Sequence, residues 1–437
     1  MPDRSYVVRG GVPLHGTVRV GGGKNAATKL IVASLLSSEP VQLSNIPRIG
    51  DVEITLNMVQ SLGTSVTWFG EQSVHLLTKQ VENAHVSEIY SGRNRIPILL
   101  IGPLLARLGH AEIPLLGGDD LGKRPVDFHV EGFRALGADV VENGNLLVFT
   151  TKRKLRGAVI TLPFPSVMAT ESLLIASVFA EGTTVLKNAA VEPEILDLVD
   201  LLQKMGAIIS HEIDRTYIIE GVPWLQGAEH TVIPDRNEAV SFAAAAIATK
   251  GSVFVEGARQ EDLRTFLNAL RKIGAGFEVR ENGIRFSHTG PLKSLAFETS
   301  VHPGFMTDWQ PPFAILLTQA DGTSIVHDTV HERRLDYAET LKRMGANIDL
   351  FSRCLGGREC RFRDRDFPHS AVIRGPASLH ALEMEVPDLR AGFSYLVAAL
   401  IAEGTSRIRG VEKLERGYEN LVEKLRGLGA EITVEEG

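Results

Sequence analysis

A glycine-containing pattern that recurs six times along the 437-residue chain constrains the fold more than any other feature. Each copy has an apolar residue, a glycine and a small residue, and successive glycines are 74, 69, 68, 71 and 84 residues apart. Glycine adopts the left-handed conformation that ends many helices, so each copy predicts a helix end followed by a strand. The copies are Leu62-Gly63-Thr64, Leu136-Gly137-Ala138, Met205-Gly206-Ala207, Ile273-Gly274-Ala275, Met344-Gly345-Ala346 and Leu428-Gly429-Ala430.

A second marker lies earlier in each unit, after an apolar segment and, in most units, before a short β-branched or apolar run. Together the two markers predict that each unit alternates helix and strand twice. The second markers are Ser38-Glu39-Pro40, Leu108-Gly109-His110, Glu181-Gly182-Thr183, Lys250-Gly251-Ser252, Asp321-Gly322-Thr323 and Glu403-Gly404-Thr405.

The two helices of a unit differ in their hydrophobic pattern. Leu198, Leu201 and Leu202 recur at the spacing of one helix face, which predicts an amphipathic outer helix. Ser241–Thr249 and Ser394–Ala402 are almost wholly apolar, which predicts buried inner helices. Sheets wrapped around buried helices make an α/β (α+β) fold. An open solenoid is the alternative, but units of about 70 residues exceed the usual period of about 20–50, which favours closed lobes of three units, divided near residue 234.

Composition narrows the class of protein. The chain is 44% hydrophobic and 23% charged, with a net charge of -7, so it lacks the basic excess typical of nucleic-acid-binding proteins. No segment reaches the roughly 18 uncharged apolar residues of a membrane span, and the N-terminus has no apolar signal-peptide core. We therefore expect a cytoplasmic protein that binds neither nucleic acid nor membranes.

The cysteines, Cys354 and Cys360, do not have the CxxC spacing of metal or redox sites. Two thiols in a chain of this size are typical of a reducing compartment. The sequence therefore predicts two ordinary thiols and no metal site.

A glycine run, Gly21-Gly22-Gly23-Lys24-Asn25, follows a predicted strand and precedes a predicted helix over Leu30–Leu36. Glycines before a helix let backbone N–H groups approach an anion, and the Lys24 cation would add to this attraction. The spacing is not that of a Walker loop, and a flexible turn is the alternative interpretation.

A second glycine-rich segment, Leu116–Asp127, carries Asp119 and Asp120 between glycines. This composition indicates a mobile lid near residues 114–125, with a solvated surface turn as the alternative. Its end, Arg124-Pro125-Val126-Asp127, is expected to be stiff because proline fixes its own backbone and restrains the residue before it.

Asp308 precedes the apolar helix of the fifth unit, where the helix dipole favours the carboxylate form that a general base needs. A simple N-cap is the alternative role. Arg95, Arg334 and Arg390 lie at unit junctions and are candidates for a clamp on a phosphate and a carboxylate, although isolated arginines are usually surface charges.

Six motifs carry a family resemblance, and they occur in one order from about Val8 to about Thr433. They read GGGKNAATK, GPLLARLG, GGDDLGKRPVD, FAEGTTVLKNAAVEPEI, HPGFMTD and DLRAG. The chain resembles the UDP-N-acetylglucosamine 1-carboxyvinyltransferases of the enolpyruvyl transferase superfamily. The resemblance implies a two-lobed inside-out α/β barrel of six βαβαββ repeats, three per lobe, with substrates between the lobes. One lobe would combine residues 1–23 with 234–437, and the other would span residues 24–233.

The resemblance also assigns roles to site residues. It implies that Lys24, Arg334 and Arg390 bind phosphoenolpyruvate, with Arg390 also catalytic, and that Arg95 contacts both substrates. Asp308 would take the proton of the acceptor hydroxyl. The residues implied for the uridine nucleotide are Asn25 at the sugar, Arg124 at the phosphates, Pro125, Val126 and Asp127 at the uracil, and Ser166 and Val167 in a segment around the phosphates.

Asp119 stands where the family usually has a cysteine that protonates phosphoenolpyruvate. The resemblance therefore implies that Asp119 is the general acid, and that fosfomycin, which alkylates that cysteine, is ineffective here. The implied reaction transfers the enolpyruvyl group to UDP-N-acetylglucosamine, the first committed step of peptidoglycan precursor synthesis, and needs no metal or cofactor.

The sequence is also compatible with other activities. Phe164 and Val191 stand where the family often has a lysine and an arginine near the diphosphate, which would suit the smaller acceptor uridine monophosphate. RNA 3'-phosphate cyclases share related repeats but bind nucleic acid, and a non-catalytic binding module is a further alternative. The oligomeric state is not predicted.

Overall fold

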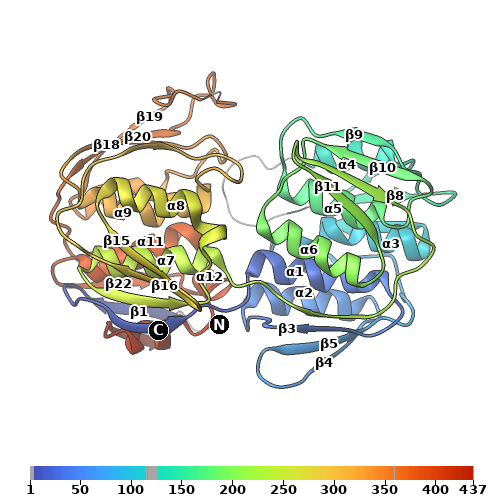
Figure 1. Ribbon diagram of the computed structural model, residues 1–437, viewed down its shortest axis with the longest axis horizontal. Helices are drawn as coiled ribbons and strands as arrows, with labels where there is room; N and C mark the ends of the chain where they lie inside the picture. The colour runs from blue at the N-terminus through green and yellow to red at the C-terminus, as the bar shows by residue number, and fades with distance from the viewer. Residues whose placement is uncertain (1–3, 115, 117–125, 359, 437) are drawn as a thin grey trace. The chain divides into compact units, whose positions relative to one another are not determined.

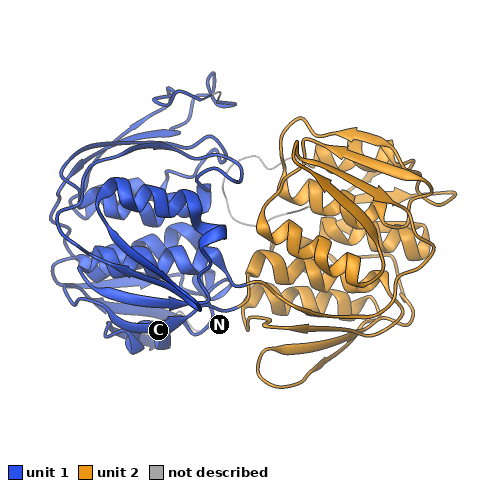
Figure 2. Ribbon diagram, in the orientation of Figure 1, with its two compact units in different colours: residues 1–21, 120–123, 234–437 blue, residues 22–119, 124–233 orange. Residues whose placement is uncertain are grey.

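The computed structural model describes residues 4–114, 116, 126–358 and 360–436, which form two compact units of mixed α/β structure. Figure 2 shows the units in separate colours. Within the described ranges, unit 1 contains residues 4–21 and 234–436, and unit 2 contains residues 22–233. The chain passes from one unit to the other at Gly21–Gly22 and at Ile233–Pro234. Asp119, Arg124 and Pro125, which are among the predicted site residues, lie outside the described residues.

Unit 2 contains, in its described part, three sheets with the orders β13-β3-β5-β4, β6-β8-β7 and β11-β12-β10-β9. Its helices are α1 (Lys24–Ala33), η1 (Ser34–Leu36), α2 (Gly50–Ser61), η2 (Glu88–Tyr90), η3 (Ile96–Leu100), α3 (Ile101–Leu108), α4 (Asp127–Ala135), α5 (Val167–Ser177) and α6 (Pro193–Lys204). Its strands are β3 (Val41–Ser44), β4 (Ser65–Trp68), β5 (Ser73–Leu77), β6 (His110–Pro114), β7 (Asp139–Asn143), β8 (Leu146–Thr150), β9 (Val159–Thr161), β10 (Thr183–Lys187), β11 (Ile208–Glu212), β12 (Thr216–Glu220) and β13 (Ala228–Thr231).

Unit 1 repeats this organisation with the described sheets β15-β16-β14-β2, β17-β18-β20-β19 and β21-β22-β1-β23. Its helices are α7 (Arg236–Ala248), α8 (Gln260–Ile273), η4 (Thr307–Trp309), α9 (Gln310–Thr318), α10 (Tyr337–Arg343), α11 (Leu389–Ile401), α12 (Glu412–Glu415) and α13 (Leu421–Gly427). Its strands are β1 (Arg4–Arg9), β2 (His15–Arg19), β14 (Ser252–Glu256), β15 (Gly276–Arg280), β16 (Gly283–Ser287), β17 (Ala296–Glu298), β18 (Gly322–His327), β19 (Asn347–Phe351), β20 (Ser370–Gly375), β21 (Glu383–Glu385), β22 (Thr405–Arg409) and β23 (Glu431–Glu436).

One sheet of unit 1 shows the repeat without interruption. The chain runs through β17, α9, β18, α10, β19 and β20, which is the predicted βαβαββ order. Strands β17 and β18 are parallel because a helix connects them, whereas β20 is antiparallel to both β18 and β19. Helix α9 contacts both α7 and α11, and Figure 1 shows these inner helices with sheets on their outer sides. The predicted α/β class is therefore confirmed.

The N-terminal segment completes two sheets of unit 1. Strand β1 lies between β22 and β23 and is antiparallel to both, while β2 pairs in parallel with β14. In unit 2, the strand before the second crossing, β13, pairs in parallel with β3. The first and last strands of the repeats are thus supplied by distant parts of the chain, which makes unit 1 discontinuous in sequence.

All six glycines of the first marker have positive φ angles, from 82° at Gly274 to 109° at Gly345, so the predicted helix ends are confirmed. The second marker is more varied. In the fourth unit the left-handed residue is Lys250, with φ 58°, and not Gly251. Gly251 is needed for another reason, because a Cβ atom there would lie 2.0 Å from the Leu14 carbonyl oxygen.

The predicted burial pattern is also confirmed. Every residue of α7 is buried, and the apolar face of α6 that contains Leu198, Leu201 and Leu202 is buried as well. The predicted helix over Leu30–Leu36 was placed too late, since α1 begins at Lys24 and continues into η1. None of the helices in the described ranges combines the length and hydrophobicity that a membrane crossing requires.

Alanine substitutions at two glycines near the C-terminus can measure backbone strain in the absence of side-chain crowding. Gly429 has φ 96° and Gly427 ends α13 with an ordinary φ, and a Cβ atom at either would meet nothing within 4 Å. We predict that Gly429→Ala lowers the free energy of unfolding of unit 1 by about 1–2 kcal/mol, because alanine resists the left-handed region. The matched variant Gly427→Ala is expected to be neutral or to stabilise by about 0.5 kcal/mol. Denaturant unfolding measures both variants, and equal effects would contradict the assignment of strain to Gly429.

Candidate functional site

The inner helices of unit 1 begin close to one another. Trp309, directly before α9, donates its indole N–H to Asn237 Oδ1 in the first turn of α7 at 2.9 Å. Asp308, also before α9, contacts Arg390 in the first turn of α11. Helix N-termini carry partial positive charge and unpaired N–H groups, so their convergence favours an anion at this end of the unit.

Asp308 is held between Arg334 and Arg390. The Arg334 Nη2 atom donates to Asp308 Oδ1 at 2.8 Å, and the Arg390 Nε atom donates to Asp308 Oδ2 at 3.1 Å. Burial alone would raise the pKa of Asp308, but the guanidinium groups of Arg390 and Arg334 outweigh it and hold this pKa well below its usual range. The structure thus brings together the predicted base and two of the predicted arginines, with Asp308 as a carboxylate.

Other buried groups fix the arginines. Arg334 Nε donates to Thr307 Oγ1 at 3.1 Å, and Arg390 Nη1 donates to the Tyr418 hydroxyl at 3.3 Å. The Asp388 carboxylate accepts the Arg390 backbone N–H at 2.9 Å and therefore caps α11. Among the described residues, the buried Arg334 Nη1 atom has no hydrogen-bond acceptor, with Asp388 Oδ1 3.7 Å away. A buried donor without an acceptor is costly, so this atom is suited to an incoming anion.

The predicted lysine of unit 2 lies at the start of α1. Lys24 Nζ contacts Asp51 Oδ2 at 2.8 Å, and its side chain is 15% exposed. Asn25 follows in the first turn of α1 and is partly exposed.

Two N–H groups of the glycine run before α1 are paired within the protein. The Gly21 N–H donates to Glu238 Oε2 at 2.8 Å, and the Gly23 N–H donates to the Ile233 carbonyl at 2.7 Å. A Cβ atom at Gly22 would lie 1.8 Å from the Asn45 carbonyl oxygen. Gly21 and Gly23 N–H groups are therefore used within the protein, and the run allows close backbone packing where the chain changes units.

The remaining predicted residues of unit 2 lie at helix starts. Arg95 is the residue before η3, which leads directly into α3. Ser166 caps α5, where its hydroxyl accepts the Ala169 N–H, and Val167 is the first residue of that helix. Val126 and Asp127 stand in the same positions relative to α4. The ψ angle of Val126 is 5°, so the backbone of this residue is not extended.

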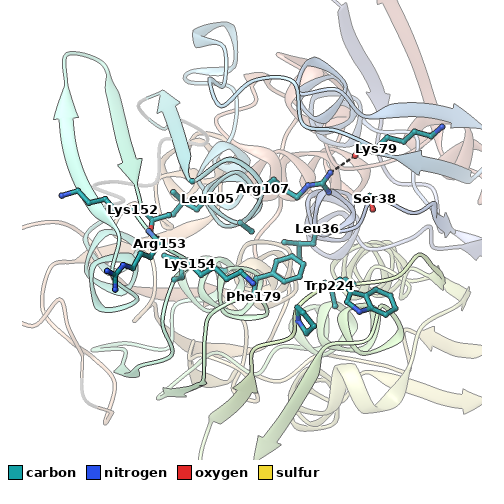
Figure 3. Close-up of a pocket in the computed structure, with 17 residues that line it drawn as sticks. Leu36, Ser38, Lys79, Leu105, Arg107, Lys152, Arg153, Lys154, Phe179 and Trp224 are labelled. Atoms are coloured by element: carbon teal, nitrogen blue, oxygen red, sulfur yellow. Dashed lines mark hydrogen bonds between the residues drawn. The ribbon is translucent and has the colours of Figure 1, made fainter.

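A cavity of about 580 Å³ in unit 2 lies away from these helix starts. Leu36, Leu105 and Ala176 line it, and they belong to the C-terminal ends of η1, α3 and α5. Figure 3 shows Arg107 among the lining residues, with its guanidinium group donating to the Lys79 carbonyl at 3.0 Å. Since the helix ends gather here, the helix starts with Lys24 and Ser166 lie at the opposite end of the unit.

Sequence reasoning missed several partners of the site. Asp51 and Tyr418 contact predicted residues but belong to segments without a distinctive motif, and Thr307 was not singled out although it lies beside Asp308 in the HPGFMTD motif. His129 in α4 is also buried, and burial together with the Arg95 charge lowers its pKa to about 3, which keeps the imidazole neutral. These residues become visible only when tertiary contacts are known. Outside this site, the described residues His327, Cys354, Cys360 and His369 form a group that could hold a metal ion.

Repeated βαβαββ units with arginines and carboxylates at the starts of buried helices define the class of protein. A sequence profile described as EPSP synthase (3-phosphoshikimate 1-carboxyvinyltransferase) matches residues 8–425, so the chain belongs to this family of enolpyruvyl transferases. Solved structures agree on the fold. The enolpyruvyl transferase NikO from Streptomyces tendae has a TM-score of 0.89 at 22% identity, covering 100% of both chains. EPSP synthase from Acinetobacter baumannii has a TM-score of 0.76 at 19% identity, covering 99% of this chain and 100% of that one.

Sequence relatives identify the branch of the family. The chain is 50% identical over 436 residues to the UDP-N-acetylglucosamine 1-carboxyvinyltransferase of Protochlamydia amoebophila, covering 98% of this chain and 94% of that protein. It is 41% identical to UDP-N-acetylglucosamine 1-carboxyvinyltransferase 1 of Caldanaerobacter subterraneus, covering 98% of each. The chain therefore belongs to the UDP-N-acetylglucosamine 1-carboxyvinyltransferase family, as the motifs indicated.

A buried carboxyl group lies in the core of unit 2. Glu171 in α5 is wholly buried, and neither carboxyl oxygen has a hydrogen-bond partner among the described residues. Lys29 Nζ lies 3.9 Å from Glu171 Oε2. Burial raises the pKa of Glu171 from 4.5 to about 8, although the Lys29 cation opposes this shift.

We predict that Glu171 makes unit 2 less stable as the pH rises. Because its pKa is higher in the folded chain, Glu171 takes up a proton on folding, and this contribution to stability is lost between pH 4.5 and about 8. Glu171→Gln should therefore flatten the fall in melting temperature across this window, whereas Glu181→Gln at an exposed position should not. Thermal unfolding at several pH values measures this, and an unchanged slope in Glu171→Gln would refute a neutral Glu171.

Proposed function

We propose that this protein transfers the enolpyruvyl group of phosphoenolpyruvate to the 3-hydroxyl of UDP-N-acetylglucosamine and releases phosphate. The proposal is carried by 50% identity over almost the whole chain to a protein of that name. The arrangement of Asp308, Arg334 and Arg390 supports it, because the reaction needs a base beside cations that bind an anionic substrate. In a bacterium the reaction would begin peptidoglycan precursor synthesis, in the cytoplasm.

Binding of phosphoenolpyruvate would change the basicity of Asp308. In the structure, Arg334 and Arg390 bind Asp308 and keep its pKa low, so it is a weak base in this state. A substrate carboxylate or phosphate that recruits these arginines would weaken their hold on Asp308. The pKa of Asp308 would then rise, and Asp308 could accept the proton of the acceptor hydroxyl.

The bond changes balance without a cofactor. Asp119 would donate a proton to the methylene carbon of phosphoenolpyruvate, and the acceptor oxygen would attack the adjacent carbon while its proton passes to Asp308. The tetrahedral intermediate would then lose phosphate, and a methyl proton would return to the Asp119 carboxylate to give the enol ether. Lys24 and the arginines would stabilise the phosphate charge, an effect that increases when water is excluded.

The following assay tests the proposed acceptor. Phosphate release from phosphoenolpyruvate is measured with UDP-N-acetylglucosamine or with uridine monophosphate as the acceptor. We expect kcat/KM for UDP-N-acetylglucosamine to exceed that for uridine monophosphate by at least about 100-fold, because the monophosphate lacks the sugar that carries the reacting hydroxyl. Faster turnover of the monophosphate would reject the proposed acceptor.

Asp308→Asn tests the base. The amide keeps the size of the side chain but cannot accept the proton, so kcat should fall by about 100-fold or more. Asp200→Asn, on the exposed face of α6, is the matched control and should retain full activity. Circular dichroism confirms folding of both variants, and an Asp308→Asn enzyme with unchanged kcat would exclude this role.

Asp119→Cys tests the general acid and the expected resistance to fosfomycin. A carboxylate is a poorer nucleophile than a thiolate, so the unmodified protein should retain activity when incubated with fosfomycin. The variant should lose activity with time and gain one covalent adduct at residue 119 by mass spectrometry. Rapid inactivation of the unmodified protein with an adduct at Asp119 would contradict the prediction.

A further inference from the structure

Two histidines and two cysteines gather at one end of the sheet β17-β18-β20-β19 in unit 1. Their candidate ligand atoms all lie within 4.8 Å of one another. We call this group the Cys₂His₂ cluster. Its members are His327, Cys354, Cys360 and His369. We propose that the Cys₂His₂ cluster binds a zinc ion as a structural site.

Sheet register brings the histidines together. His327 is the last residue of β18, and it pairs with Ser370, the first residue of β20. His369 therefore lies beside the end of β18, and the imidazole centroids of His327 and His369 are 5.5 Å apart. The cysteines come from the segment that connects β19 to β20, strands that Figure 1 shows beside β18.

The ligand atoms lie close enough together for a tetrahedral site to form around an ion. Zinc lies about 2.3 Å from sulfur and about 2.0 Å from nitrogen, which places ligand atoms about 3.3–3.8 Å apart. Cys354 Sγ is already 3.4 Å from His369 Nε2. The wider limit of 4.8 Å for the cluster requires only a small contraction around the ion.

His327, a member of the cluster, has a buried nitrogen that is unsatisfied among the described residues. Its side chain has 0% exposure, and its Nε2 atom has no hydrogen-bond partner among the described residues. Its other nitrogen, Nδ1, lies 3.2 Å from Glu298 Oε2. A buried polar atom without a partner is costly, and a metal ion would satisfy it.

The surroundings supply the outer contacts that metal sites require. A ligating histidine usually donates its second N–H to a carboxylate or carbonyl, and this holds for both histidines. Glu298 accepts from His327, and the Phe367 carbonyl lies 3.0 Å from His369 Nδ1. The Phe362 N–H donates to Cys360 Sγ at 3.4 Å, as is favourable for a thiolate.

Glu298 also shapes the loop that carries the cysteines. Its carboxylate accepts the Gly357 N–H at 2.8 Å and the Arg358 N–H at 3.1 Å. A Cβ atom at Gly356 would lie 2.2 Å from His327 Nδ1, so only glycine allows the loop to approach this closely. The loop is therefore folded against the same carboxylate–histidine pair that orients the cluster.

Charge and ligand type favour zinc. Two thiolates and two neutral imidazoles around Zn²⁺ have no net charge, which suits a site packed against Phe362 and Phe367. Soft sulfur with imidazole nitrogen in tetrahedral geometry is typical of zinc, whereas magnesium and calcium prefer oxygen ligands. Four protein ligands leave no open position, so the site is structural and not catalytic.

Cobalt uptake tests the proposal on the full-length protein. The chain is reduced with a phosphine, freed of metal with a chelator, titrated with Co²⁺ and passed through a desalting column. We expect about one cobalt per chain, with thiolate-to-cobalt charge-transfer bands and the intense visible absorption of tetrahedral cobalt, and displacement of this signal by Zn²⁺. No cobalt retention by the folded, reduced chain would overturn the proposal, as would a Cys354–Cys360 disulfide that persists in the reduced protein.

Variants identify the ligands. Cys354→Ser and His369→Asn should each weaken cobalt binding by more than about 100-fold, and Glu298→Gln should weaken it by about 10–100-fold without changing the spectrum. His380→Asn is the control, since this histidine is 63% exposed in the same unit and should leave binding unchanged. Equal cobalt binding by Cys354→Ser and the control would overturn the assignment.

A measurement on the unmodified chain covers the case in which a ligand variant does not fold. Zinc should protect both thiols from a disulfide reagent, and chelation should expose them with at least about a tenfold faster reaction. Hydrogen exchange of the Val330 and His331 amides should slow on zinc binding, because these amides donate to Asp328, the residue after His327. Thiols that react equally fast with and without zinc would refute the site.

Discussion

The candidate site depends on an excess of positive charge at the end of unit 1 where α7, α9 and α11 begin. The helix N-termini and the guanidinium groups of Arg334 and Arg390 repel one another unless an anion lies among them. Asp308 supplies that anion in the structure, through contacts of 2.8 and 3.1 Å. A substrate anion therefore has to compete with a residue of the protein, and this competition connects anion binding to the basicity of Asp308.

The repeat explains why polar groups gather at one end of each unit. The inner helices are largely apolar, so most of their charged residues lie where a helix begins and N–H groups lack partners, with Lys29 and Glu171 of unit 2 among the exceptions. Parallel placement of the inner helices then brings these starts together. The cavity at the opposite end of unit 2 shows that concavity alone does not mark the site, since none of the predicted substrate-binding residues lines it.

The ends of the helices could be predicted from the sequence because the backbone conformation of single residues determines them. Helix ends at Gly206 or Gly345 require positive φ, and the glycine pattern reports this directly. The prediction was wrong where a distant contact decides, as at Gly251, which is glycine because the Leu14 carbonyl approaches it. Distant contacts also use two N–H groups of the glycine run, those of Gly21 and Gly23, which the sequence could not indicate.

Candidate site residues within a motif, such as Asp308 and Arg390, could be selected from the sequence, whereas the residues that contact them could be found only from the structure. Adjacent residues of a strand face opposite sides, so the end of β18 directs His327 to the Cys₂His₂ cluster and Asp328 elsewhere. Asp328 Oδ2 accepts from Thr307 Oγ1 at 2.8 Å, and Thr307 in turn accepts from Arg334. Ordering the end of β18 at the cluster would thus restrict Arg334 through Asp328 and Thr307. The Cys₂His₂ cluster would then contribute to the candidate site by fixing the position of Arg334, without contacting the substrate.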